Sequence, residues 1–86
     1  MPKKILVVDD EPAILKMISA RLRAAGYGVI SAENGSDALQ LARTEKPDLI
    51  ILDLMLPKMD GFEVCATLKS DERFPRNFNL FAHYKR

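Results

Sequence analysis

The sequence predicts an α/β domain built as a doubly wound parallel sheet. Two short and continuous apolar runs, residues 5–8 and 49–52, have the character of strands that are buried on both faces. Each run leads directly into acidic residues, at the edge where open α/β sheets bind ligands. Strand-like and helix-like segments alternate along the chain with short links between them, as expected when helices cover both faces of a parallel sheet.

The first strand, residues 5–8, is followed by three acids and then by a predicted helix. Pro12 suits the first helical turn because its missing N–H is not needed there. Gly26 is a natural C-terminal stop for this helix. The apolar residues between these two points recur at helical spacing and should face the sheet: Ile14, Leu15, Ile18, Leu22 and Ala25.

Residues 28–32 form a second and less apolar strand, which we expect nearer to an edge of the sheet. Asn34 and Gly35 turn the chain into a short helix that Pro47 closes. The inward positions of this helix are Ala38, Leu39, Leu41 and Ala42.

The third strand, residues 49–52, leads into Asp53. Pro57 and the pair Asp60-Gly61 then mark a turn, after which Asp60 can cap a third helix. Right-handed crossovers restrict the order of the strands, and the two most apolar strands should be neighbours. The expected order is 2-1-3, which brings Asp9, Asp10 and Asp53 to one crevice where the winding direction changes.

Composition limits the possible partners and locations. The 86 residues form at most one small domain, and 13 basic against 12 acidic residues give a net charge of +1, so we expect no nucleic acid binding within this chain. A single cysteine, Cys65, cannot form an internal disulfide. The apolar stretch near the N-terminus is too short for a signal peptide or a membrane span, so we predict a cytoplasmic protein with no membrane contact.

Three carboxylates in one crevice repel one another unless a cation or water compensates their charge. Mg²⁺ is the economical partner because it takes oxygen ligands, usually one or two carboxylates together with waters and phosphate oxygens. The alternative interpretation is structural: Asp10 caps the first helix and Asp53 starts a loop. Two acidic strand ends together with the ordered turn favour a ligand site over this alternative.

Two stretches of the sequence resemble the receiver domain of bacterial response regulators, and the resemblance covers about residues 3–74. They are Val7-Val8-Asp9-Asp10-Glu11-Pro12 and Ile51-Leu52-Asp53-Leu54-Met55-Leu56-Pro57-Lys58-Met59-Asp60-Gly61. The resemblance implies the flavodoxin-like receiver fold, with strand order 2-1-3 at its start. It also implies a phosphoacceptor module of a two-component phosphorelay, whose partner is a histidine kinase or a phosphotransfer protein.

The resemblance assigns roles residue by residue. Asp53 resembles the phosphoacceptor, which would attack the phosphorus of a phosphohistidine. Asp10 and Asp53 resemble direct Mg²⁺ ligands, the backbone carbonyl of Met55 resembles a third, and Asp9 resembles a ligand that acts largely through water. Such a domain is not an enzyme beyond its own phosphorylation and dephosphorylation.

The sequence departs from the family pattern after about residue 74, which divides the chain into a receiver-like domain (1–74) and a divergent tail (75–86). A receiver normally continues through a fourth strand ending in Ser or Thr and a fifth strand ending in Lys, so the later βα units are missing or replaced here. The hydroxyl is due near His83, and no residue matches the lysine. Residues 78–82 alternate weakly between apolar and polar, as a substitute strand would.

Three other functions remain as alternatives. The chain could be a receiver-like interaction module that takes no phosphoryl group. A phosphatase with an aspartyl nucleophile ranks lower, because such enzymes usually carry a second acid two positions on, where this chain has Met55. Nucleotide binding ranks lowest, since neither glycine-rich phosphate motif is present.

The central character of strand 49–52 also predicts self-association. The sequence supplies no full set of later elements to flank this apolar strand, and an uncovered strand edge is a template for pairing with another chain. Either residues 78–82 fold back as a substitute fourth strand, or the edge is covered between chains. We expect a dimer or a larger assembly, formed through the sheet edge or by exchange of the tail.

Overall fold

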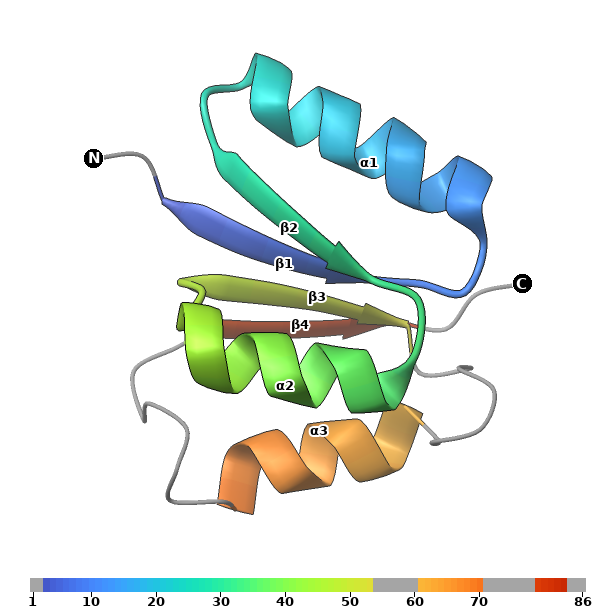
Figure 1. Cartoon of the computed structure of the whole chain (residues 1–86), viewed down its shortest axis with the longest axis vertical. Helices are drawn as coiled ribbons and strands as arrows, with labels where there is room; N and C mark the ends of the chain where they lie inside the picture. Colours follow the sequence, from blue (N-terminus) through green and yellow to red (C-terminus); the bar gives the residue numbers. More distant parts are fainter. Residues whose placement is uncertain (1–2, 54–60, 71–78, 84–86) are drawn as a thin grey trace.

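The computed structural model describes residues 3–53, 61–70 and 79–83. Side chains are described throughout 3–53, and in the later segments at residues 63, 64 and 66–70. These residues form a parallel sheet with helices on both faces (Figure 1). In chain order the elements are β1 (Lys4–Val8), α1 (Pro12–Ala24), β2 (Gly28–Ala32), α2 (Gly35–Glu45), β3 (Leu49–Asp53), α3 (Gly61–Ser70) and β4 (Asn79–His83).

The four strands are ordered β2-β1-β3-β4, and all three pairings are parallel. The predicted doubly wound α/β class and the order 2-1-3 are therefore confirmed, with β2 at one edge. The fourth strand overlaps residues 78–82, for which the sequence predicts a substitute strand, and its register places Ile50 opposite Leu80. None of the helices within the described ranges combines the length and the apolar character that crossing a membrane requires.

The two ends of helix α1 are set by a proline and a glycine. Pro12 occupies the first turn and Glu11 is the N-cap, without a capping hydrogen bond from its side chain. At the other end Gly26 has a φ of 96°, and the N–H of Tyr27 donates to the carbonyl of Leu22 at 3.1 Å. This is the Schellman arrangement, in which glycine adopts the left-handed conformation without strain.

One inward position of α1 differs from the helical pattern. Ala25, predicted to face the sheet, is exposed at the C-cap, whereas Ser19 is buried. The reason is that the helix ends one residue earlier than its apolar spacing implies, so Ala25 no longer follows the helical rotation.

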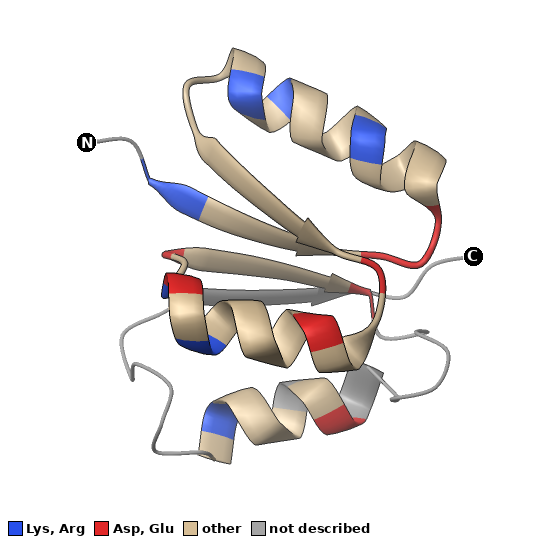
Figure 2. Cartoon of the chain, viewed as in Figure 1, with Lys and Arg blue, Asp and Glu red and all other residues tan. Residues whose placement is uncertain are grey.

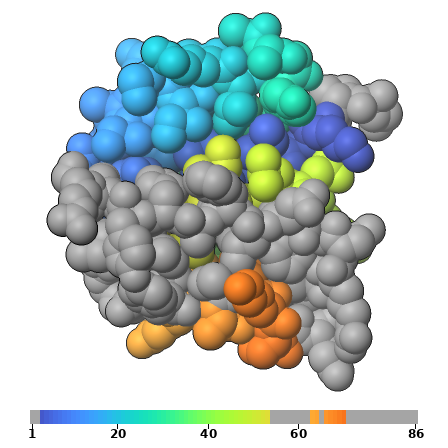
Figure 3. All heavy atoms as spheres, turned by 180° about the vertical axis from the view of Figure 1, so that it is seen from behind, coloured from blue at the N-terminus to red at the C-terminus, as the bar shows by residue number. Residues whose placement is uncertain are grey.

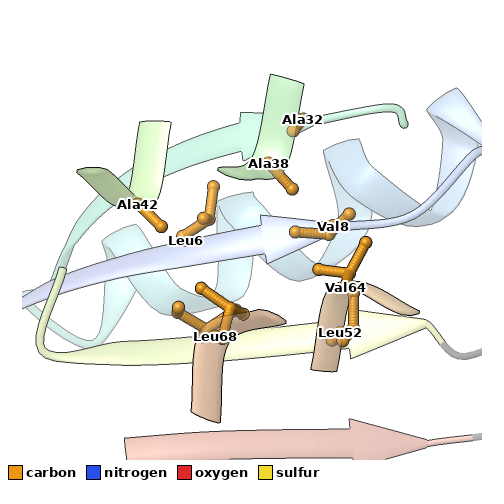
Figure 4. Packing of buried hydrophobic residues seen from close by; sticks show 9 residues of the cluster. Leu6, Val8, Ala32, Ala38, Ala42, Leu52, Val64 and Leu68 are labelled. Atoms are coloured by element: carbon orange, nitrogen blue, oxygen red, sulfur yellow. The ribbon is translucent and has the colours of Figure 1, made fainter. Parts of the chain in front are cut away.

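The larger apolar cluster lies between the sheet and the helices α2 and α3 (Figure 4). Side chains of β1 and β3 meet small residues of α2, Ala38 and Ala42, and larger ones of α3, Val64 and Leu68. Small residues of α2 and larger ones of α3 thus fill the same layer above the sheet. This face is the main core of the described residues.

The opposite face is covered by α1, which packs on β1 and β2. Here Ile5 and Val7 of β1 are buried with Leu15, but Leu49 and Ile51 of β3 are only half-buried. Seen from behind, yellow-green atoms of the β3 region lie at the surface beside the blue and cyan atoms of α1 (Figure 3). The prediction of a strand buried on both faces is thus correct for β1 and correct for β3 on one face only.

Candidate functional site

Asp9 directly follows β1 and is held in place from two sides. Its backbone N–H donates to the carbonyl of Ala32 at 3.1 Å, which continues the pairing of β1 with β2. One oxygen of its carboxylate, Oδ1, accepts the N–H of Glu11 at 2.9 Å. The residue is 1% exposed. This carboxylate therefore has a fixed position at the end of the strand.

Asp53 is the last residue of β3 and is completely buried, at 0% exposed. The register pairs Val8 with Leu52, so the residues that follow them, Asp9 and Asp53, lie side by side at the C-terminal ends of the two strands. Asp10 is the next residue along and is half-buried. Three acids thus lie together at the C-terminal ends of two adjacent parallel strands.

A carboxylate oxygen from each of Asp9, Asp10 and Asp53 lies within 4.8 Å of the other two. No other group of three or more His, Cys, Asp or Glu side chains within the described ranges comes together in this way. Acidic residues gather where the strands end, as red segments in Figure 2. The cluster lies at the switch point between β1 and β3, where the chain winds outward in opposite directions.

The donor set fits a hard divalent cation. It offers only oxygen ligands, and the three carboxylates would repel one another without a compensating charge, since Asp9 and Asp53 are buried. The N-cap position of α1 belongs to Glu11, so Asp10 lies one residue before the cap. One of its carboxylate oxygens lies in the acidic cluster.

Other predicted positions lie outside the described residues. These are Met55, Pro57 and Asp60, and also the side chains of Cys65 and His83. The backbone of His83 is described, and it stands opposite Asp53 in the register of β3 and β4.

Glu11 is not among the predicted site residues, yet its backbone N–H holds Asp9. A bond from an aspartate side chain to the N–H two residues on is the ordinary behaviour of aspartate in a turn. The run of acids before Pro12 was the signal that could have revealed it.

The topology and the acidic cluster together define an α/β domain with a ligand site at its switch point. The chain belongs to the response regulator receiver domain family, whose model matches residues 5–79. The resemblance seen in the sequence motifs is therefore confirmed. Receiver domains are the signalling modules of two-component systems, not enzymes in the usual sense.

Curated relatives support the same family. The chain is 56% identical over 72 residues to the alkaline phosphatase synthesis transcriptional regulatory protein PhoP of Bacillus subtilis, which covers 84% of this chain and 30% of that protein. It is 53% identical over 73 residues to the DNA-binding dual master transcriptional regulator RpaA of Synechocystis, covering 85% and 30%. The chain thus spans about a third of the length of these relatives.

Solved structures agree with the fold. The N-terminal domain of a response regulator receiver protein from Methanoculleus marisnigri superposes with a TM-score of 0.88 at 35% identity, covering 93% of this chain and 64% of that one. The chemotaxis response regulator CheY4 of Vibrio cholerae gives 0.85 at 34% identity, covering 94% and 68%. A third similar chain comes from a crystal structure of the histidine kinase ThkA in complex with the response regulator protein TrrA, with a TM-score of 0.83, 35% identity and coverage of 93% and 66%.

Proposed function

We propose that this receiver domain accepts a phosphoryl group on Asp53 from a histidine kinase or phosphotransfer protein. The observation that carries the proposal is the meeting of three carboxylates within 4.8 Å at the strand ends of a receiver-family sheet. The kinase complex in which one structural neighbour was solved supports the class of partner. A partner of that kind and the single cysteine both fit a cytoplasmic location.

In the proposed reaction an oxygen of the Asp53 carboxylate attacks the phosphorus of a phosphohistidine. A bond forms between this oxygen and phosphorus, the bond between phosphorus and the imidazole nitrogen breaks, and the imidazole takes up a proton. The chain's part is mainly positioning, since Asp53 is buried and fixed at the end of a central strand. Beyond its own phosphorylation and dephosphorylation we assign it no catalytic activity.

Asp9, Asp10 and Asp53 are the described residues that would hold Mg²⁺, with Asp9 acting largely through water and the carbonyl of Met55 as a further ligand. When bound, the ion would neutralise charge on the phosphoryl oxygens and on the carboxylates themselves. The hydrogen bond from the Glu11 N–H to one Asp9 oxygen would fix the orientation of this carboxylate in the site.

The test of the phosphoacceptor is labelling with acetyl phosphate and Mg²⁺, followed by the mass of the intact chain. Asp53→Asn keeps the size and removes the nucleophilic charge, so it should fold and gain no phosphoryl mass. Asp37→Asn makes the same change at an exposed acid of α2 and should be labelled like the wild type. Equal labelling of Asp53→Asn and the wild type would overturn the assignment.

The test of the metal site is unfolding by urea with and without MgCl₂. A ligand that binds only the folded state stabilises it, by about 1.4 kcal/mol at ten times its Kd. We expect this gain for the wild type and its loss in Asp10→Ala, with Asp37→Ala as the matched control. An unchanged gain in Asp10→Ala would place the ion elsewhere.

A second candidate, an interaction module that takes no phosphoryl group, is favoured by one observation. The strand-end residue opposite Asp53 is His83, where the family resemblance leads one to expect a Ser or Thr hydroxyl. Under this candidate the folded wild type would gain no mass from acetyl phosphate, and His83→Thr would restore labelling. Labelling of the wild type excludes it.

A further inference from the structure

A second polar site lies between α1 and the outer strand β2. It is a hollow of about 260 Å³ that opens to solvent, and none of its residues belongs to the acidic cluster. Its walls are formed by Pro12, Leu15, Lys16, Ser19, Arg23, Ser31 and Glu33. Because most of these side chains are polar or charged, the hollow suits a hydrophilic ligand.

Ser19 forms the buried part of this hollow. It is only 6% exposed, and its hydroxyl has no hydrogen-bond partner among the residues that the structure describes. The hydroxyls of Thr44 and Ser70 behave differently, since each donates to the carbonyl four residues earlier, at 3.0 and 2.8 Å. Because this hydroxyl lines the hollow and bonds to no described residue, a group that enters can accept a hydrogen bond from it.

Two cations flank Ser19 on the same stripe of α1. Lys16 and Arg23 precede and follow it by three and four residues, the spacing at which helical side chains are neighbours. Neither cation is in an ion pair with a carboxylate of the described segments. Glu33 supplies a single opposing charge, which leaves the side chains of the hollow with a net charge of +1.

The position of Arg23 favours an anion as the ligand over an added peptide strand. Its Nη2 donates to the carbonyl of Val29 at 3.5 Å, which covers an outward-facing acceptor on the edge of β2. An added peptide strand needs that edge free, so strand addition is disfavoured. The remaining N–H groups of the guanidinium stay available for an anion, because an arginine side chain has five.

We propose that this hollow binds a small phosphate-bearing ligand. Arg23 and Lys16 hold the phosphate oxygens, and the Ser19 hydroxyl donates from below. Arginine and lysine are the side chains best suited to phosphate, and the volume falls below that of most drug-sized pockets. The inference does not depend on phosphorylation of Asp53.

The experiment is a titration of the ¹⁵N-labelled chain with inorganic phosphate, followed by NMR. EDTA keeps the acidic cluster free of metal, and sodium chloride keeps the ionic strength constant. The expected result is a saturable shift of amide signals around Ser19 in α1. Arg23→Gln should weaken binding about tenfold or more, because it removes charged hydrogen bonds.

Arg21→Gln is the matched control. It makes the same change of charge on the same helix at an exposed residue that does not line the hollow, so binding should stay within about twofold of the wild type. An equal loss of phosphate affinity in Arg21→Gln and Arg23→Gln would mean that phosphate is attracted only by the general positive charge of the helix, and this would overturn the site. The absence of a saturable shift would overturn it as well.

Two further variants keep the proposal falsifiable if Arg23→Gln folds poorly. Glu33→Gln removes the opposing charge and should tighten phosphate binding, a gain that misfolding cannot produce. Ser19→Ala should weaken binding while leaving the amide spectrum otherwise similar. No gain in Glu33→Gln, or acetate bound as tightly as phosphate by the wild type, would overturn the assigned ligand class.

Discussion

The two faces of the sheet use the same strands but are covered to different extents. Between the sheet and the pair α2 and α3, nine residues form one buried cluster. On the other face α1 buries three, and Leu49 and Ile51 of β3 remain half-buried. Ile50 and Ile51 are adjacent and chemically identical, yet Ile50 is 1% exposed and Ile51 is not buried.

This difference shows what an apolar run specifies and what it does not. Residues 5–8 and 49–52 look alike in sequence, and both form central strands. Whether a side chain is buried on a given face depends on which helix lies above it. The helix α1 connects β1 to β2 and packs over those two strands, so β3 receives less cover on that face.

The largest expected effect comes from removing β4, which flanks the less covered strand. A chain ending at Arg76 loses residues 79–83 and opens the edge of β3 to other chains. We predict that the full chain forms a dimer or a larger assembly through its outer edge or tail. We expect the shortened chain to form larger assemblies than the full chain.

Light scattering of both chains at high micromolar concentration is the measurement. Circular dichroism of the same samples shows whether each is folded. If both are well-folded monomers, the sheet needs no partner and the prediction of self-association is wrong.

The next largest effect compares the two faces directly. Ile50→Ala removes a fully buried side chain and should lower the free energy of unfolding by about 2–4 kcal/mol. Ile51→Ala makes the same change one residue later and should cost less than about half as much, because water already reaches that side chain.

Urea unfolding of both variants under one set of conditions tests this comparison. The neighbouring positions share strand and backbone environment, so strand propensity largely cancels. Equal losses of stability would mean that the α1 face of β3 is covered as completely as the other face.

Much of the fold and of the site was predictable, and the exceptions have physical causes. The position of Asp53 beside the other acids was predictable. The strand pattern and the right-handed crossovers between parallel strands bring the C-terminal ends of the strands together. The half-burial of Ile51 was not predictable, since it depends on where α1 lies. The hollow around Ser19 was also missed, because a serine within an amphipathic pattern carries no sign of a cavity beside it.

The smallest expected effect on stability comes from changing the N-cap residues of α1 and α2, the helices that cover opposite faces of the sheet. In α2 the side chain of Asn34 accepts the N–H of Asp37 at 2.9 Å, whereas Glu11 of α1 makes no such bond. Asn34→Ala should therefore cost about 1 kcal/mol in the free energy of unfolding, within the usual range of about 0.5–2. Glu11→Ala should cost less than Asn34→Ala, because the Glu11 side chain makes no capping hydrogen bond and the backbone N–H that holds Asp9 remains. Urea midpoints in EDTA separate this effect from any metal at the acidic cluster. A larger loss in Glu11→Ala than in Asn34→Ala would mean that the Glu11 side chain stabilises the start of α1 by a contact other than a capping hydrogen bond, and would contradict the prediction.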